Sequence, residues 1–167
     1  RNNLKLLDLG CGEGRDAVYF AKNGFMTVGL DLSHIGLEKT KKYAEETGVK
    51  IKIIQADIET YKLTEFYDVI YSSGSLHYIP PKQRREKLEH FKSQTTPPGI
   101  HAFLVLVEKP FIPKAPDAEE EILFKSGELM SYYWDWEIMF CKEYIIDCES
   151  SGIPHKHAIN EIIAKRG

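Results

Sequence analysis

Short β-rich apolar runs alternate with amphipathic, helix-like segments over the first two-thirds of the chain. The expected strands are Leu4–Leu9, Met26–Leu30, Lys50–Ile54, Tyr67–Tyr71 and Ile100–Val107. The expected helices are Gly14–Asn23, a segment that is capped by Ser33 and runs to about Thr47, and a segment that follows Pro80-Pro81. Strands and helices that alternate at this spacing predict a parallel sheet with helices on both faces.

The pattern changes after Glu108. Residues Lys109–Glu121 hold three prolines and four acidic residues without periodicity, which predicts a long loop. A short helix is expected to begin near Ser126. The last two β-rich stretches, Trp136–Cys148 and His157–Lys165, flank a turn and predict an antiparallel hairpin. The predicted fold is therefore α/β, with a Rossmann-like, mostly parallel sheet of seven strands that ends in this hairpin.

Composition narrows the class of protein. The 167 residues predict a single domain over residues 1–167, and because the chain opens at Arg1 without Met we expect a missing N-terminal segment. The longest apolar run, Ala102–Val107, is six residues, far below the ~20 that a membrane helix needs. A net charge of −3 supplies no basic field for nucleic acid, and three cysteines are typical of a protein of the reducing cytoplasm. Two basic runs are expected to be solvated helix faces: Lys39, Lys41 and Lys42, and Lys82, Arg84, Arg85 and Lys87.

A glycine-rich turn follows the first expected strand. Its sequence is Asp8-Leu9-Gly10-Cys11-Gly12-Glu13-Gly14, and a helix is expected directly after it. Glycines let the backbone turn sharply and let a ligand approach it closely, beside the N–H groups of the helix start. A tight turn without any ligand is the alternative interpretation.

Polar residues follow three more expected strands. Asp31 comes 21 residues after Gly10, Asp57 follows the third strand, and Ser72-Ser73-Gly74 follows the fourth. The carboxyl ends of parallel strands meet at one edge of the sheet, where open α/β sheets bind ligands. Each acid taken alone is also explained as a helix cap. The dinucleotide fingerprint would place a third glycine where this chain has Arg15, which disfavours a nicotinamide cofactor.

The glycine-rich turn resembles motif I of the class I S-adenosylmethionine (SAM) methyltransferases, and the predicted sheet resembles theirs over nearly the whole chain. This resemblance implies SAM as cofactor and S-adenosylhomocysteine as product. It implies motif I beside the methionyl part, Asp31 on the ribose and Leu32, Asp57 and Ile58 around the adenine. Arg15, at the start of the helix, is expected either to hold the methionyl carboxylate or to be solvated. The expected cofactor-binding residues are Asp8, Gly10, Cys11, Gly12, Arg15, Asp31, Leu32, Asp57, Ile58 and Ser72.

Within that superfamily the chain resembles the tellurite-resistance (TehB-like) methyltransferases. Motif I extended to Asp16 carries the likeness, together with the stretches Phe124–Leu129 and Tyr132–Glu137. The resemblance implies a small acceptor such as tellurite, selenite or a thiol. The chain departs from that family at Ile146-Asp147, where the family has a His-Arg pair, and an oxyanion needs cationic donors.

His77 follows the fourth expected strand and is the best-placed titratable residue for a catalytic base or a substrate contact, although a packed histidine is the alternative. Tyr132, Tyr133, Trp134 and Trp136 are expected either to wall the site or to belong to the core. Cys148, His155 and His157 lack the spacing of a known zinc motif, and alternation along a strand produces His-x-His by chance. We therefore expect no metal site.

Taken together, the sequence predicts a cytoplasmic SAM-dependent methyltransferase that acts on a small molecule, as a monomer or homodimer, with no nucleic-acid or membrane partner. Two alternatives stay open: a methyltransferase of RNA or protein, and a SAM-binding module without catalysis. Ser72-Ser73-Gly74-Ser75 stands where amino-methylating nucleic-acid enzymes usually carry an Asn/Asp-Pro-Pro-Tyr loop, which favours the small-molecule acceptor.

Overall fold

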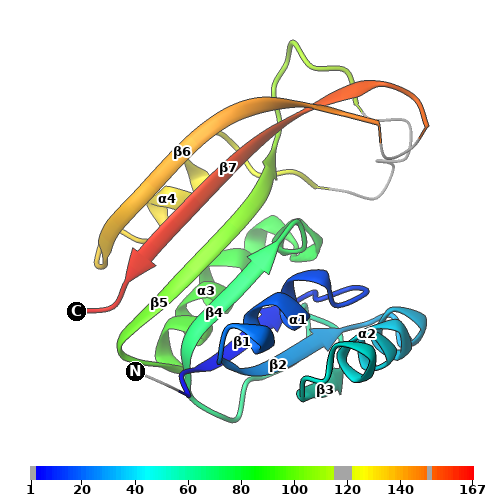
Figure 1. The fold of residues 1–167 in the computed structure, drawn as a ribbon. Coiled ribbons are helices and arrows are strands. Elements are labelled where there is room, and N and C mark those ends of the chain that lie inside the picture. Colours follow the sequence, from blue (N-terminus) through cyan, green and yellow to red (C-terminus); the bar gives the residue numbers. More distant parts are fainter. Residues whose placement is uncertain (1–2, 115–121, 150–151) are drawn as a thin grey trace.

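The computed structural model describes residues 3–114, 122–149 and 152–167 (Figure 1). Its elements in chain order are β1 (Lys5–Leu9), α1 (Arg15–Lys22), β2 (Met26–Asp31), α2 (His34–Thr47), β3 (Ile51–Gln55), β4 (Tyr67–Ser73), the 3-10 helix η1 (Leu76–Tyr78), α3 (Pro81–Ser93), β5 (Thr95–Val107), α4 (Glu128–Ser131), β6 (Glu137–Cys148) and β7 (His155–Lys165). None of the helices in these described ranges is long and apolar enough to cross a membrane.

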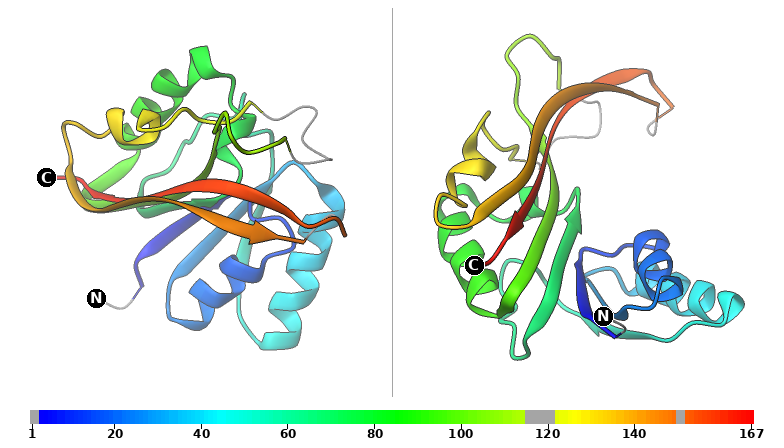
Figure 2. Two further views of the ribbon diagram at one scale, coloured as in Figure 1. Left: turned by 90° about the horizontal axis from the view of Figure 1, so that it is seen from above. Right: turned by 60° about the vertical axis from the view of Figure 1, so that its left-hand side comes forward.

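All seven strands form one sheet in the order β3-β2-β1-β4-β5-β7-β6. The pairs among the first five strands are parallel, and β7 runs antiparallel to both β5 and β6. Helices α1 and α2 cover one face of the sheet, whereas α3 and α4 cover the other (Figure 2). The predicted fold is therefore confirmed. Strand order reverses between β1 and β4, and the carboxyl edge at such a reversal is where α/β proteins bind ligands.

The core lies mainly between the sheet and α3. Leu88 and Phe91 of α3 join Phe103 and Val105 of β5 in one buried cluster, and Tyr133 is fully buried in the same cluster. Each such side chain stabilises the fold by roughly 1.5–3 kcal/mol through the apolar surface that it removes from water. Of the predicted aromatic group, Tyr132 is also buried and Trp136 packs against the cluster, whereas Trp134 is 82% exposed.

Element boundaries differ from expectation by a few residues in several places, among them β5, β7 and α4. β5 begins at Thr95 rather than Ile100, because Thr95 pairs with Tyr67 before the register shifts. β7 begins at His155 rather than His157, because His155 pairs with the last residue of β6. The helix expected near Ser126 is the single turn α4. Residues 109–114 of the expected loop form no helix or strand, and 115–121 lie outside the described residues.

Candidate functional site

The turn between β1 and α1 has Gly10, Gly12 and Gly14 at φ angles of 76°, 54° and 83°, a region that favours glycine. A Cβ on Gly10 would stand 2.0 Å from Ser75 Oγ, and one on Gly14 would stand 2.6 Å from the Thr40 side chain. A Cβ on Gly12 would meet no atom within 4 Å. Two of the glycines therefore serve close packing, whereas Gly12 presents bare backbone to open space.

Asp31, at the end of β2, holds this turn. Its Oδ2 accepts a hydrogen bond from the Gly12 N–H and its Oδ1 accepts one from the Ser33 N–H, both at 2.8 Å. The N–H of Ala56, just after β3, donates to the Asp31 carbonyl at 3.0 Å. Three of the loops that were expected to form the ligand edge thus meet at Asp31.

Asp8 is the buried acid of the site. It is 2% exposed, and its Oδ2 has no hydrogen-bond partner among the described residues. Burial, reinforced by the Asp16 and Asp31 carboxylates, raises the pKa of Asp8 to about 8. A cation placed here would be attracted by all three carboxylates. SAM carries a sulfonium and an ammonium group, so the residues present fit it.

A hollow of about 330 Å³ lies over this carboxylate group. Its lining consists of Asp8, Gly10, Cys11, Glu13, Arg15, Asp16 and Ser73. Four of the expected cofactor residues are therefore brought together here. The Arg15 side chain is 88% exposed and reaches only the neighbouring Asp16, so its role toward a methionyl carboxylate stays a prediction.

Asp16, Ser73 and Tyr71 were not among the expected cofactor-binding residues, although Ser73 belongs to the polar segment expected after the fourth strand. Tyr71 donates to Asp16 Oδ2 at 2.9 Å, and Ser73 lines the hollow. The expected Ser72 is fully buried and donates to the Leu9 carbonyl at 2.9 Å. Alternation along β4 places residues 71 and 73 on one face and 72 on the other, so the period of two was the signal that pointed to Ser73.

The expected adenine contacts lie at the same edge. Leu32 directly follows β2 and is 64% exposed. Asp57 accepts from the Glu59 N–H at 2.8 Å, which is the turn-capping role of the alternative interpretation. Ile58 is half-buried against the main core. All three residues therefore lie beside the carboxyl edge of the sheet, and their contact with adenine stays a prediction.

His77 lies on η1 and is 3% exposed. Its ring packs on Tyr78 with 4.4 Å between ring centroids. Burial lowers the pKa of His77 to about 4, and the charges of Arg84 and His157 add to the effect. The imidazole is therefore neutral near pH 7, and as a base it is weak.

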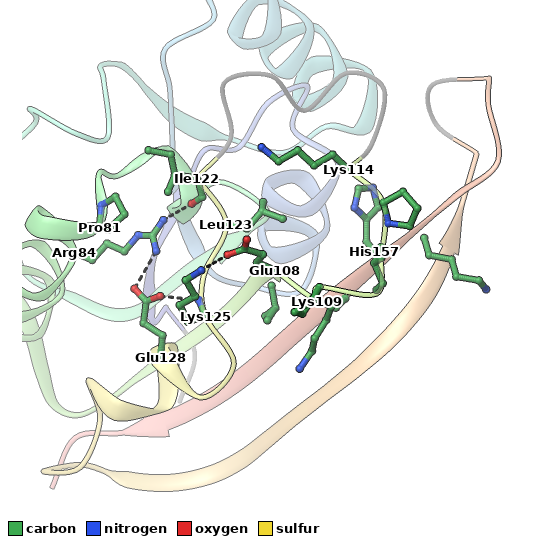
Figure 3. A pocket seen from close by; sticks show the side chains of 16 residues that line it. Pro81, Arg84, Glu108, Lys109, Lys114, Ile122, Leu123, Lys125, Glu128 and His157 are labelled. Carbon is green, nitrogen blue, oxygen red and sulfur yellow. Dashed lines mark hydrogen bonds and ion pairs between the residues drawn. The ribbon is translucent and has the colours of Figure 1, made fainter.

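A second, larger cavity of about 430 Å³ lies where β5 ends and α3 and β7 begin (Figure 3). Arg84, expected in a solvated run, is 1% exposed at its wall. Its guanidinium donates to the Ile79 and Ile122 carbonyls and to Glu128, and stacks 3.9 Å from the centre of the Phe124 ring. The expectation of a solvated side chain is wrong for Arg84, because Glu128 pairs with its charge and Phe124 packs against its guanidinium.

The lining of this cavity is rich in cations. Arg84 and four lysines line it together with two carboxylates, Glu108 and Glu128, among the described residues; the lysines are Lys109, Lys114, Lys125 and Lys156. Lys125 pairs with Glu108, and both of these lining residues are exposed (Figure 3). Lys109 and Lys156 pair with Glu143 and Asp147, which do not belong to the lining. The lining therefore combines apolar side chains with more cations than carboxylates.

Comparison with known proteins shows the family to which the chain belongs. A family model described as a methyltransferase domain matches residues 6–99. Ubiquinone biosynthesis O-methyltransferase from Rickettsia canadensis is 39% identical over 83 residues, which cover 50% of this chain and 35% of that protein. Its namesake from Photorhabdus laumondii is 29% identical over 107 residues, or 63% of this chain and 43% of the relative. The chain thus spans less than half the length of these curated relatives.

Solved structures share the fold. TehB from Haemophilus influenzae matches with a TM-score of 0.88 and 23% identity over 99% of this chain and 58% of its own. Magnesium protoporphyrin IX methyltransferase from Synechocystis PCC 6803, solved with bound SAM, matches with a TM-score of 0.72 and 16% identity over 99% of this chain and 71% of its own. With the family model matched from β1 into β5 and the seven-stranded sheet in common, the chain belongs to the methyltransferase-domain family, with the class I SAM-dependent fold.

Proposed function

We propose that this chain transfers a methyl group from SAM to a small acceptor that binds in the 430 Å³ cavity. The observation that carries the proposal is the buried Oδ2 of Asp8, which has no hydrogen-bond partner among the described residues and belongs to the lining of the 330 Å³ hollow. When bound, SAM supplies an electrophilic methyl group on a sulfonium. The chain supplies Asp8 and Asp16 to attract that cation and Asp31 to bind the ribose hydroxyls.

The acceptor that the cavity favours is anionic. Its volume lies within the range of small-molecule sites, and its lining has five cationic side chains against two carboxylates. Tellurite, selenite, a thiolate or an acidic phenol meets this requirement. The cationic donors that Ile146-Asp147 lacks relative to the TehB-like family are offered here by lysines from other elements. A soft anionic nucleophile needs no proton removed during attack, so the chain's main tasks are alignment and exclusion of water.

His77 is the residue that we assign to the acceptor rather than to the cofactor. It lies near Arg84 and His157, which both line the cavity, and it is almost fully buried. A neutral imidazole there orients an acceptor or a lining side chain by hydrogen bonding.

The test is methyl transfer from isotope-labelled SAM to tellurite, selenite, thiols and phenols, with volatile products trapped. Each organic acceptor is offered with and without a carboxylate. We expect the carboxylate-bearing member of each pair to have at least tenfold higher kcat/KM. Lys114→Ala should reduce this ratio of kcat/KM values, whereas the control Lys22→Ala on α1 should leave the ratio unchanged. Equal use of both members would refute the anionic acceptor. Label in added RNA or protein would refute the small-molecule acceptor. A chain that binds SAM but labels none of the acceptors would favour a non-catalytic SAM-binding module.

A further inference from the structure

The end of the β6–β7 hairpin brings together three metal-ligating side chains. Cys148 and His155 are direct cross-strand partners, and His157 lies two residues further along β7. Direct partners share one face of a sheet, and so do residues two apart on one strand. Cys148 Sγ and one ring nitrogen of each histidine lie within 4.8 Å of one another, and all three residues are half-buried.

A hydrogen bond to the backbone fixes the orientation of the His155 ring. Its Nδ1 lies 2.7 Å from the Ile153 carbonyl oxygen, which can only accept, so Nδ1 carries the proton. The lone pair is therefore on Nε2, which lies 2.9 Å from Nε2 of His157. Metal-binding histidines are commonly held in this way, with the second ring nitrogen donating to a backbone carbonyl.

We propose that Cys148 Sγ, His155 Nε2 and His157 Nε2 bind one Zn²⁺ ion. Two imidazoles and one thiolate suit Zn²⁺, whereas Mg²⁺ and Ca²⁺ prefer oxygen ligands. Tetrahedral zinc places two nitrogen ligands roughly 3.3 Å apart, so the two rings need to separate by only a few tenths of an ångström. Three protein ligands leave a fourth position open. Because His157 lines the 430 Å³ cavity, that ion stands at the cavity wall.

The experiment uses the whole chain, prepared without a histidine tag, stripped with a chelator and kept reduced. Titration with Co²⁺, a spectroscopic substitute for Zn²⁺, reports thiolate ligation through a sulfur-to-cobalt charge-transfer band, and elemental analysis of the Zn²⁺-loaded protein gives the stoichiometry. We expect one ion per chain and a charge-transfer band that Zn²⁺ abolishes. Cys148→Ser removes the band, and His157→Ala weakens Zn²⁺ binding at least tenfold.

Cys141→Ser is the matched control, since Cys141 is a free cysteine of the same strand on the opposite face. It should leave the band and the Zn²⁺ affinity unchanged. SAM affinity, measured by calorimetry on every variant, checks that each one folds and is expected to stay within twofold of wild type. A wild-type chain without the band, or equal loss in Cys141→Ser and Cys148→Ser, would overturn the site. Neither result depends on whether the chain transfers methyl groups.

Discussion

The carboxylate of Asp31 accepts a hydrogen bond from the Gly12 N–H at 2.8 Å, so the end of β2 fixes the turn that follows β1. The acid assigned to the ribose is therefore also a support for the backbone that faces the cofactor. Asp31→Ala removes both contributions. We expect SAM binding to weaken by about 1.5–3 kcal/mol, since two charge-assisted hydrogen bonds are lost.

Isothermal calorimetry measures this loss directly. Glu38→Ala, which removes an exposed acid from α2, should bind SAM as wild type does. An Asp31→Ala chain with wild-type affinity would show that Asp31 does not hold the ribose.

Asp8 makes stability depend on pH. Its pKa is about 8 in the folded chain, against about 3.9 for an unfolded aspartate, so the folded chain retains a proton that the unfolded chain releases. Stability that comes from Asp8 therefore falls as pH rises from about 4 to about 8, and it is constant above that range. Asp8→Asn abolishes this component. The check is urea unfolding of both proteins at several pH values, and parallel pH profiles would contradict the expectation.

Cofactor binding depends on the same proton. A cation beside Asp8 favours the ionised carboxylate, so SAM affinity should rise between pH 6 and 8, by up to about tenfold per pH unit. S-adenosylhomocysteine lacks the sulfonium charge and should show a shallower rise. Calorimetry at several pH values measures the affinity for both ligands. A SAM affinity that does not depend on pH would show that no cationic group of SAM lies next to Asp8.

Gly12 and Gly14 should respond differently to alanine. Both have positive φ, which costs a non-glycine residue roughly 1–2 kcal/mol. Gly14→Ala adds a clash with Thr40 and is expected to destabilise the fold further, whereas Gly12→Ala meets no protein atom. We therefore expect Gly12→Ala to fold with lost SAM binding. Thermal unfolding and calorimetry together test this pair, and normal SAM binding by Gly12→Ala would mean that the cofactor does not approach the turn.

Arg84 and Glu128 form an ion pair at 2.9 Å with side chains only 1% and 17% exposed. Removing one partner of such a pair leaves an uncompensated charge, so Arg84→Leu should lower the free energy of unfolding by about 3 kcal/mol. Lys82 is an exposed cation two residues earlier on α3. Lys82→Leu is therefore the control, and it should change the free energy of unfolding by less than about 0.5 kcal/mol. Urea denaturation measures both variants, and equal effects would indicate that the buried pair contributes little.

His77→Ala should lower turnover and leave SAM affinity nearly unchanged. Because the pKa of His77 is about 4, its ionisation produces no inflection in the rate near pH 6.5. The pH profile of kcat/KM and calorimetry with SAM provide the two measurements. A His77→Ala chain that loses SAM affinity but keeps its turnover would place His77 on the cofactor instead.

Local patterns along the chain predicted the sheet and where its carboxyl edge lies, and the resemblance of the glycine-rich turn to motif I predicted the family. Glycines at Gly10, Gly12 and Gly14, the acid at Asp31 and the alternation of strands and helices are patterns visible along the chain, and a backbone with positive φ favours glycine whatever surrounds it. Gly24 and Gly48, which follow the ends of α1 and α2, adopt positive φ, and a glycine at that position is a helix-stop signal of the same short-range kind.

Tertiary structure decided the features that depend on partners far along the chain. Arg84 is buried because Glu128 and Phe124 come from segments 40 and more residues away. The partners of Lys109 and Lys156, and the approach of Cys148 to two histidines, likewise depend on how β5, β6 and β7 align. A charge or a ligand is stabilised by its surroundings in space, and periodicity along the chain carries no information about those surroundings.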